Sequence, residues 1–158
     1  MKKVLFVCLG NICRSPSAEG ILKKYIADNK LNRFIKVDSA GTINYHEDEL
    51  PDERMRMIAK KRGYILEHIS RKFDPKKDFQ DFDFIITMDD DNYKDIVRLD
   101  INNKFRKKIY KMTDFIDDKN VKAVPDPYDG TDDDFNYVLD LLEAGAKNVL
   151  QKIRKEIG

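Results

Sequence analysis

The chain has 158 residues, a length typical of one domain that buries most of its apolar surface, so we expect a single domain over residues 1–158. Its 30 basic and 29 acidic side chains leave a formal net charge of +1, and no basic stripe carries interleaved aromatic residues, which argues against a nucleic-acid partner. No apolar segment has the length of a membrane span or of a signal peptide, and two cysteines suit a reducing compartment, so we expect a cytoplasmic protein with no membrane partner.

The first predicted elements are a strand, a tight loop and a helix, all within the sequence VLFVCLGNICRSPSAE. Residues 4–7 form an apolar run that predicts a buried strand, and this run ends at Cys8. The loop continues to Arg14, after which Ser15 can cap a helix and Pro16 suits its first position. An apolar face at helical spacing follows: Ala18, Ile21, Leu22, Tyr25 and Ile26.

A loop between a strand and a helix N-terminus can bind an anion, because successive backbone N–H groups converge there and the helix dipole adds positive potential. Arg14 adds a planar guanidinium that can bind two phosphate oxygens at once. The same potential favours the thiolate of Cys8, the nucleophilic form, and so predicts attack of sulfur on phosphorus. The spacing alone is equally compatible with a cysteine that is only a small buried residue. The other residues of this predicted phosphate-binding loop are Leu9, Gly10, Asn11, Ile12, Cys13 and Ser15.

A second strand and a second helix are predicted next. Residues 34–37 have the pattern of a short strand, and a turn is expected at residues 39–42. Residues 51–62 have a helical pattern that Pro51 opens and Gly63 closes, although the apolar face of this helix is narrow.

The remaining chain predicts two further strands and a long helix. Residues 82–88 form a strong strand pattern that leads into an acidic turn, 89–91, at a helix N-terminus, and residues 109–112 are a plausible last strand. Thr131 and three aspartates then open an amphipathic helix whose apolar positions are Phe135, Val138, Leu139, Leu142, Ala146, Val149, Leu150 and Ile153.

This alternation of strands and helices predicts an α/β fold, with a four-stranded parallel sheet covered by helices on both faces. Ligands of such sheets bind beyond the carboxyl ends of the strands, which is where the loop after Cys8 lies.

Loss of a phosphate ester's leaving group needs an acid, and the best candidate is Asp126 in the sequence VPDPYDG. Two prolines and a glycine predict a rigid loop here, which could hold a carboxyl group at a set distance from the reacting oxygen. Taken alone, the segment is more simply interpreted as an ordinary Asp-Pro turn.

The sequence VCLGNICRSPSAE closely resembles the phosphate-binding loop of the low-molecular-weight protein tyrosine phosphatases, and the resemblance extends over nearly the whole chain. The Asp-Pro-Tyr sequence before the last helix is similar to the family's general-acid loop, which places that role on Asp126 rather than Asp129. The resemblance implies a flavodoxin-like fold of the phosphatase I type. It also implies a polar network that supports the loop, formed by Asn11, Ser15, Ser39 and His68.

The resemblance further implies hydrolysis of phosphotyrosine through a cysteinyl-phosphate intermediate, with Cys8 as nucleophile, Arg14 as phosphate binder and Asp126 as general acid and base. The implied partners are phosphotyrosine-containing proteins and, in the active site, inorganic phosphate or similar oxyanions. We expect a monomer or a weak homodimer. No cofactor or metal is expected, and the spacings of the two cysteines and of His46 and His68 do not match a compact zinc site.

The expected walls of the substrate pocket are Leu9, Tyr45, Tyr128 and Asp129. An aromatic ring could lie flat between the two tyrosines, whereas the family commonly has a second tyrosine where this chain has Asp129. The acidic residues 47–49 near Tyr45 either favour basic peptides or form an ordinary solvated loop. No role is predicted for His46.

Three other functions remain open on the sequence. A protein-arginine phosphatase of the same family typically carries threonine where this chain has Ile12, so tyrosine is favoured. An arsenate reductase of related fold needs cysteines beyond Cys8 and Cys13. A phosphocysteine carrier or a silent phosphotyrosine-binding module would not need Asp126.

A redox role is predicted for Cys13, which could form a reversible disulfide with Cys8 and so protect it from overoxidation. The alternative is a buried thiol that only packs behind the loop.

Overall fold

In this computed structural model, which describes residues 1–158, four parallel strands form one sheet in the order β2-β1-β3-β4. The strands are β1 (Lys2–Cys8), β2 (Ile35–Gly41), β3 (Phe84–Thr87) and β4 (Ile109–Lys111). The helices are α1 (Arg14–Asp28), α2 (Glu53–Lys61), α3 (Asp78–Asp81), α4 (Asp90–Leu99) and α5 (Asp132–Ile157). Two short 3₁₀ helices flank β4, η1 (Arg106–Lys108) and η2 (Met112–Phe115).

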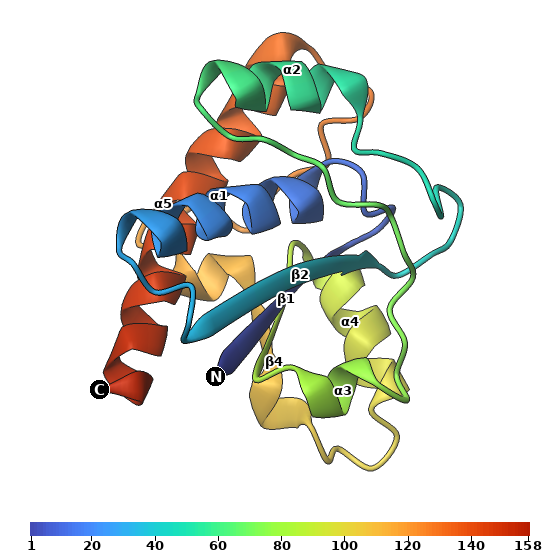
Figure 1. The fold of residues 1–158 in the computed structure, drawn as a ribbon. Coiled ribbons are helices and arrows are strands. Elements are labelled where there is room, and N and C mark those ends of the chain that lie inside the picture. Colours follow the sequence, from blue (N-terminus) through green and yellow to red (C-terminus); the bar gives the residue numbers. More distant parts are fainter.

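The side chains of β1 alternate between two hydrophobic cores, one on each face of the sheet. Val4 and Phe6 belong to the larger core with α1, α2 and α5, whereas Leu5 and Val7 belong to the smaller core with α3 and α4. Figure 1 shows α1 and α5 on one side of the sheet and α3 and α4 on the other. The predicted α/β fold with helices on both faces is confirmed. Residues 4–7 of β1 are apolar at every position because this part of the strand is buried on both faces of the sheet.

The order of the strands places a crevice at the carboxyl end of β1. The chain moves from β1 to β2 on one side and later to β3 on the other, so the direction of winding reverses at β1. The loops that leave β1 and β3 therefore diverge, and ligands of open α/β sheets bind at such points. Both chain termini lie at the opposite end of the sheet (Figure 1).

The predicted elements are found with shifted boundaries. The first helix begins at Arg14, one residue before the predicted cap at Ser15, because the hydroxyl of Ser15 bonds within the loop instead. The turn predicted at 39–42 is largely strand, since β2 continues beside β1 until Gly41 pairs with Cys8. Helix α3 was not predicted.

Helices α2 and α5 follow their sequence signals. Asp52 caps α2 by accepting hydrogen bonds from two backbone N–H groups, and Gly63 ends this segment with a positive φ of 91°. Thr131 caps α5 in a reciprocal capping box with Asp134.

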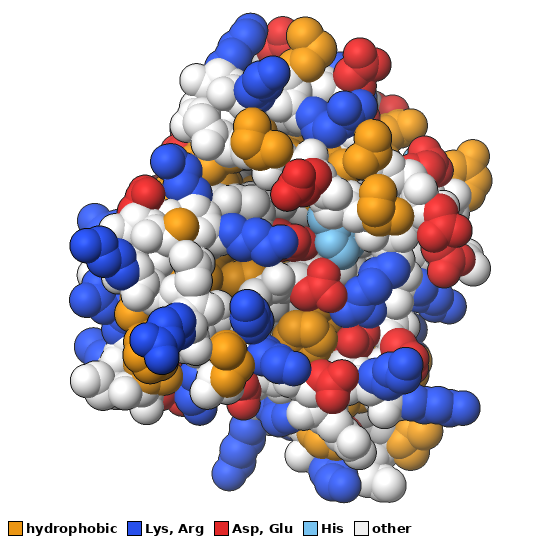
Figure 2. Space-filling view, viewed as in Figure 1, with side chains coloured by type: hydrophobic (Ala, Val, Ile, Leu, Met, Phe, Trp, Pro, Cys, Tyr) orange, Lys and Arg blue, Asp and Glu red, His pale blue; other side chains and the backbone are white.

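No helix combines the length and the apolar character that crossing a membrane requires. On the face shown in Figure 2, basic and acidic side chains are interspersed, and hydrophobic side chains are scattered among them.

Candidate active site

Cys8 ends β1 and lies at a small cavity of about 120 Å³ that opens beside the loop. Its side chain is 2% exposed. The sulfur lies 3.0 Å from the hydroxyl of Ser15 and accepts a hydrogen bond from the backbone N–H of Asn11 at 3.3 Å. A backbone donor and a hydroxyl group therefore both contact this sulfur at the edge of the cavity.

The loop turns its carbonyl groups away from the cavity. Four of them accept hydrogen bonds from neighbouring segments: Cys8 O from Thr42 N (2.9 Å), Leu9 O from Ile43 N (3.1 Å), Gly10 O from Ser70 Oγ (3.1 Å) and Ile12 O from Asp52 N (2.7 Å). In a trans peptide the following N–H points opposite to its carbonyl. The N–H groups after these carbonyls are therefore directed to the inside of the loop, as an anion site requires.

Asn11 holds this conformation from within. Its φ of 58° is left-handed, which is costly for a residue with a side chain. The amide nitrogen donates to Ser15 Oγ at 2.8 Å and to Ser39 Oγ at 3.0 Å. The amide oxygen lies 2.9 Å from His68 Nε2 and accepts from the N–H of Arg71 at 3.0 Å. All four hydrogen-bonding positions of the amide are thus used, which offsets the backbone strain.

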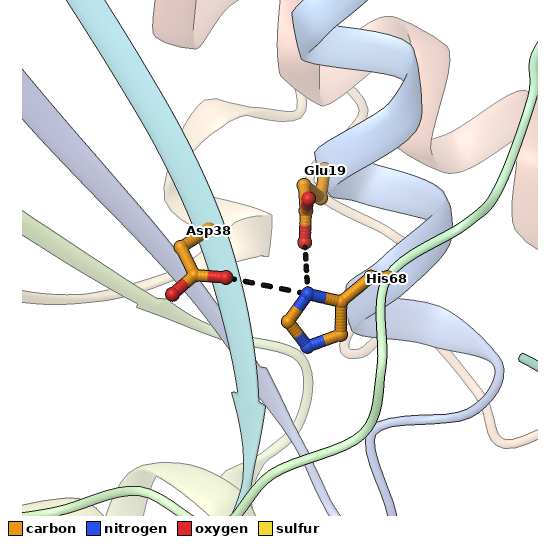
Figure 3. Close-up of side chains that lie close together, drawn as sticks. All are labelled: Glu19, Asp38 and His68. Atoms are coloured by element: carbon orange, nitrogen blue, oxygen red, sulfur yellow. Dashed lines mark ion pairs between the residues drawn. The ribbon is translucent and has the colours of Figure 1, made fainter. Parts of the chain in front are cut away.

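His68 connects Asn11 to two carboxylates (Figure 3). Its Nδ1 lies 3.1 Å from Glu19 and 3.3 Å from Asp38. Asn11 Oδ1 is an amide oxygen and can only accept hydrogen bonds. It accepts one from the Arg71 N–H, and its contact with the ring requires His68 Nε2 to donate. The two carboxylates thus face Nδ1, the ring nitrogen on the side away from Asn11.

Glu19 is 4% exposed, yet its charge is well compensated. Burial opposes ionisation, but hydrogen bonds from His68, Lys23 and Ser39 outweigh it and lower the pKa of this carboxyl. Glu19, Asp38 and His68 lie close enough together to share a metal ion. Each already has protein partners, so we interpret them as part of the loop's support.

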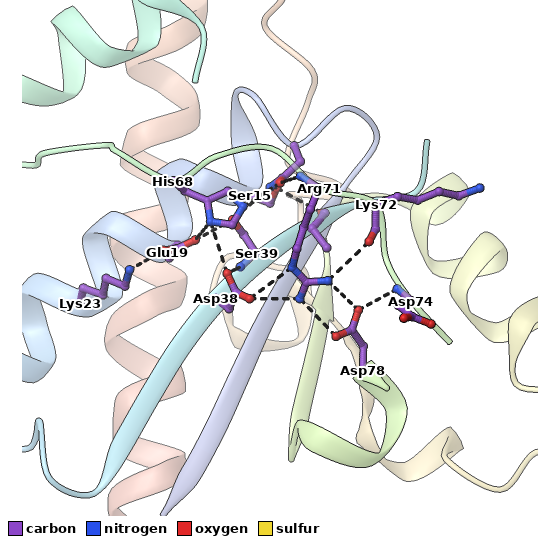
Figure 4. A network of polar contacts seen from close by, with 12 residues as sticks. Ser15, Glu19, Lys23, Asp38, Ser39, His68, Arg71, Lys72, Asp74 and Asp78 are labelled. Carbon is purple, nitrogen blue, oxygen red and sulfur yellow. Dashed lines mark hydrogen bonds and ion pairs between the residues drawn. The ribbon is translucent and has the colours of Figure 1, made fainter. Parts of the chain in front are cut away.

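The network continues from Asp38 to Arg71 and Asp78, as Figure 4 shows. Arg71 donates to Asp38 at 3.0 Å and to the buried Asp78 at 2.9 Å. The backbone N–H of Arg71 also donates to Asn11 Oδ1. The ion pairs of the Arg71 side chain therefore fix a residue that supports Asn11 and, through Asn11, the loop.

Arg14 is buried at the first position of α1, with 3% exposure. Its Nη1 donates to Asp89 at 2.6 Å and to the carbonyl of Val124 at 3.1 Å, and its Nη2 lies 3.8 Å from Asp126. Burial alone would lower the pKa of this guanidinium, but the charges of Cys8 and Asp89 outweigh burial and raise it. A permanent positive charge is therefore held beside the cavity.

Asp126 lies on the cavity's rim, in the predicted loop before α5. Its carboxylate accepts a hydrogen bond from the N–H of Tyr128 at 3.1 Å, and the N–H of Val124 donates to Met88 O, just beyond β3, at 2.9 Å. The side chain is 46% exposed, so it can meet both substrate and water.

The cavity wall differs from the expectation at two positions. Leu9 and Tyr128 line it as predicted, but Tyr45 is 79% exposed and does not, and neither does Asp129. His46 stands where Tyr45 was expected, with the edge of one ring against the other at 4.8 Å between centroids. Gly10 leaves room for the imidazole, because a Cβ at that position would lie 3.1 Å from His46 Cδ2.

Cys13 also lines the cavity and is 4% exposed. Burial, together with the negative charge of Asp52, raises the pKa of its thiol. At neutral pH this thiol is therefore protonated, and Cys8 is the better candidate for a nucleophile.

The structure brings together Cys8, Arg14 and Asp126 at one cavity and joins Asn11, Ser15, Ser39 and His68 in one network. Five further residues at the site had no predicted role: Asp89, Glu19, Asp38, Arg71 and His46. Of these, Glu19 carried a usable signal, because it follows Ser15 by one helical turn and so shares its face.

Comparison with known proteins identifies close relatives. A family profile described as low molecular weight phosphotyrosine protein phosphatase matches residues 3–157. A Synechocystis protein provisionally named a low molecular weight protein-tyrosine-phosphatase is 44% identical over 155 residues, covering 98% of each chain.

Solved structures agree with these sequence matches. A protein tyrosine phosphatase of Entamoeba histolytica, solved with Hepes in its active site, has a TM-score of 0.94 at 42% identity, with 100% of each chain covered. A Drosophila arginine phosphatase has a TM-score of 0.88 at 32% identity, over 96% of this chain and 97% of its own.

Proposed function

This chain belongs to the low-molecular-weight phosphotyrosine protein phosphatase family, and from that premise we propose that it hydrolyses phosphotyrosine in proteins through a phosphocysteine on Cys8. The observation that carries the proposal is the meeting of Cys8, Arg14 and Asp126 at one anion-sized cavity. Each of the three supplies a different part of a phosphoryl transfer.

In the first step the Cys8 thiolate attacks phosphorus as the bond from phosphorus to the phenolic oxygen breaks, and Asp126 gives its proton to that oxygen. Arg14 and the inward N–H groups of the loop bind the equatorial oxygens, over which negative charge spreads in the transition state. The Ser15 hydroxyl, 3.0 Å from the sulfur, stabilises the thiolate.

In the second step water attacks phosphorus, the sulfur–phosphorus bond breaks, and Asp126 takes the proton from the water. Ser15 then stabilises the departing thiolate. Because Asp126 must begin protonated while Cys8 is ionised, activity should have a bell-shaped pH dependence with a mildly acidic optimum.

Phosphotyrosine is favoured over phosphoarginine by Ile12, an apolar wall of the cavity at the position where the arginine branch typically has threonine. The aromatic substituent is supported by the apolar and ring surfaces of Leu9, Ile43, His46 and Tyr128. Phosphoarginine is nevertheless the necessary comparison, since a Drosophila arginine phosphatase is among the relatives.

A reducing compartment such as the cytoplasm suits this chemistry, because the nucleophilic thiol has to stay reduced. Inorganic phosphate and similar oxyanions should occupy the loop as inhibitors. We expect the enzyme to act as a monomer or weak homodimer.

The test is phosphate release from matched phosphotyrosine and phosphoarginine peptides, with Cys8→Ser as the control. Release from phosphotyrosine that the substitution abolishes would support the proposal. Preference for phosphoarginine would move the enzyme to the other branch of the family. No release from either peptide, with phosphate still bound, would indicate a carrier or binding module.

A further inference from the structure

A second hollow adjoins the catalytic cavity and has no part in the mechanism above. Its volume is about 530 Å³, and it lies between the segment 46–53, the start of α2 and the loop that carries Tyr128. Ile12, His46 and Tyr128 line both hollows. A peptide whose phosphorylated side chain enters the cavity therefore has this groove beside it at the cavity mouth.

The groove is strongly acidic. It is lined by the carboxylates of Asp48, Glu49, Asp52 and Glu53 and by the guanidinium of Arg56. Arg56 is bound to the carbonyl of Pro51 at 2.9 Å, and Asp52 is paired with Arg54 at 3.5 Å. Asp48 and Glu53 are exposed and form no ion pair, so their charges are available to a ligand, whereas the exposed Glu49 contacts His46.

The groove is fixed relative to the phosphate-binding loop. Asp48 N donates to Ser70 O, and Ser70 N donates to Glu49 O, both at 2.9 Å. The Ser70 hydroxyl in turn donates to Gly10 O of the loop. The shared wall residue His46 is itself held by Glu49, 3.0 Å from its Nδ1. The acidic wall is therefore built before substrate arrives, which limits the entropy lost on binding.

We propose that this groove binds a lysine or arginine side chain next to the phosphotyrosine of the substrate, and so selects basic peptide sequences. The inference rests on the proposed phosphatase activity and adds a substrate class to it. Of the acidic residues 47–49 that the sequence indicated, Asp48 and Glu49 line the groove and Glu47 does not.

The experiment compares kcat/KM for two phosphotyrosine peptides that differ only in having lysines or glutamates beside the phosphotyrosine. A small aryl phosphate, too short to reach the groove, is the reference substrate. The test variant is Asp48→Asn with Glu53→Gln; asparagine tolerates the left-handed φ of 68° at position 48. The matched control, Glu47→Gln with Glu156→Gln, removes the same charge from exposed residues outside the groove.

We expect the wild type to prefer the lysine peptide, and the test variant to lose about three- to tenfold of that preference, the size expected for two exposed ion pairs. High salt should reduce the preference in the same way, while the control variant keeps it. Equal rates for both wild-type peptides, or equal loss in the control, would overturn the groove while leaving phosphatase activity intact. Failure with the aryl phosphate as well would overturn both.

Discussion

Asp89 lies 2.6 Å from Nη1 of Arg14. This carboxylate, at the N-cap of α4 just after β3, therefore orients the guanidinium at the cavity. Asp89→Asn keeps the oxygen that caps α4 through Asn92 N, but it removes the charge that Arg14 faces. We expect kcat/KM to fall about 10- to 100-fold, because a misplaced positioning group weakens transition-state binding. Steady-state kinetics with an aryl phosphate would measure this loss.

The matched control for Asp89 is Asp90→Asn, one residue further along α4. Asp90 pairs with Lys111 at 2.8 Å and lies away from the cavity lining. Its variant should keep near wild-type kinetics. Equal losses in both variants would show that the helix start, and not the contact with Arg14, determines activity.

Asp126→Asn should lower kcat by about 10²- to 10⁴-fold for phenyl phosphate, because the leaving oxygen would depart without a proton. Esters of acidic phenols need little protonation and should lose far less. The measurement is kcat across a series of aryl phosphates. Asp129→Asn is the control, since Asp129 lies outside the cavity lining. A uniform loss across the series in Asp126→Asn would exclude a general acid here.

The lowered pKa of Glu19 predicts that the free energy of unfolding falls at acid pH. Its pKa is lowered below the ordinary value of 4.5 in the folded chain, so the unfolded chain takes up the proton first as pH falls. The stabilisation is complete above the unfolded value and is lost as pH falls through the folded pKa. Glu19→Gln should lose about 2 kcal/mol of unfolding free energy at pH 7, the worth of its charge-assisted hydrogen bonds. It should also show a shallower decline below about pH 5.

Urea unfolding at pH 7, 5 and 3 would measure both effects of Glu19→Gln. Lys23→Gln is a useful comparison, because it removes one exposed donor to Glu19 and leaves His68 and Ser39 in place. It should have a small effect. A wild-type stability curve with the same slope as the Glu19→Gln curve would contradict the assigned ionisation.

Cys13→Ser tests the predicted redox partner of Cys8. After brief peroxide treatment the wild type should regain most of its activity with a thiol reductant, because a Cys8–Cys13 disulfide can be reduced. The serine variant should lose activity irreversibly as Cys8 is oxidised further. Mass spectrometry would identify the disulfide and the higher oxides. Equal recovery in both proteins would leave Cys13 as a packing residue.

The sequence predicted the parts of this molecule that depend on local pattern. The alternation of strands and helices, the loop after Cys8 and the rigid turn around Asp126 each have a local signal. The contact between Arg14 and Asp89 joins residues 75 positions apart, so no periodicity could indicate it. The exchange of Tyr45 for His46 in the wall depends on which way one turn faces, and no strand or helix period applies there.

Asn11 offers the sharpest test of how the loop is held, because glycine and alanine separate its two contributions. Glycine accepts a φ of 58° without strain but forms none of the four side-chain hydrogen bonds, whereas alanine adds the strain to the same loss. Asn11→Gly should lose about 2–3 kcal/mol of unfolding free energy by leaving buried partners unsatisfied, and Asn11→Ala about 1–2 kcal/mol more. Both should bind inorganic phosphate more weakly, and alanine should be the worse of the two. Urea unfolding and phosphate inhibition constants would measure the two effects separately. If the two variants bound phosphate equally well, the hydrogen bonds alone would hold the loop, and the left-handed backbone would need no special residue.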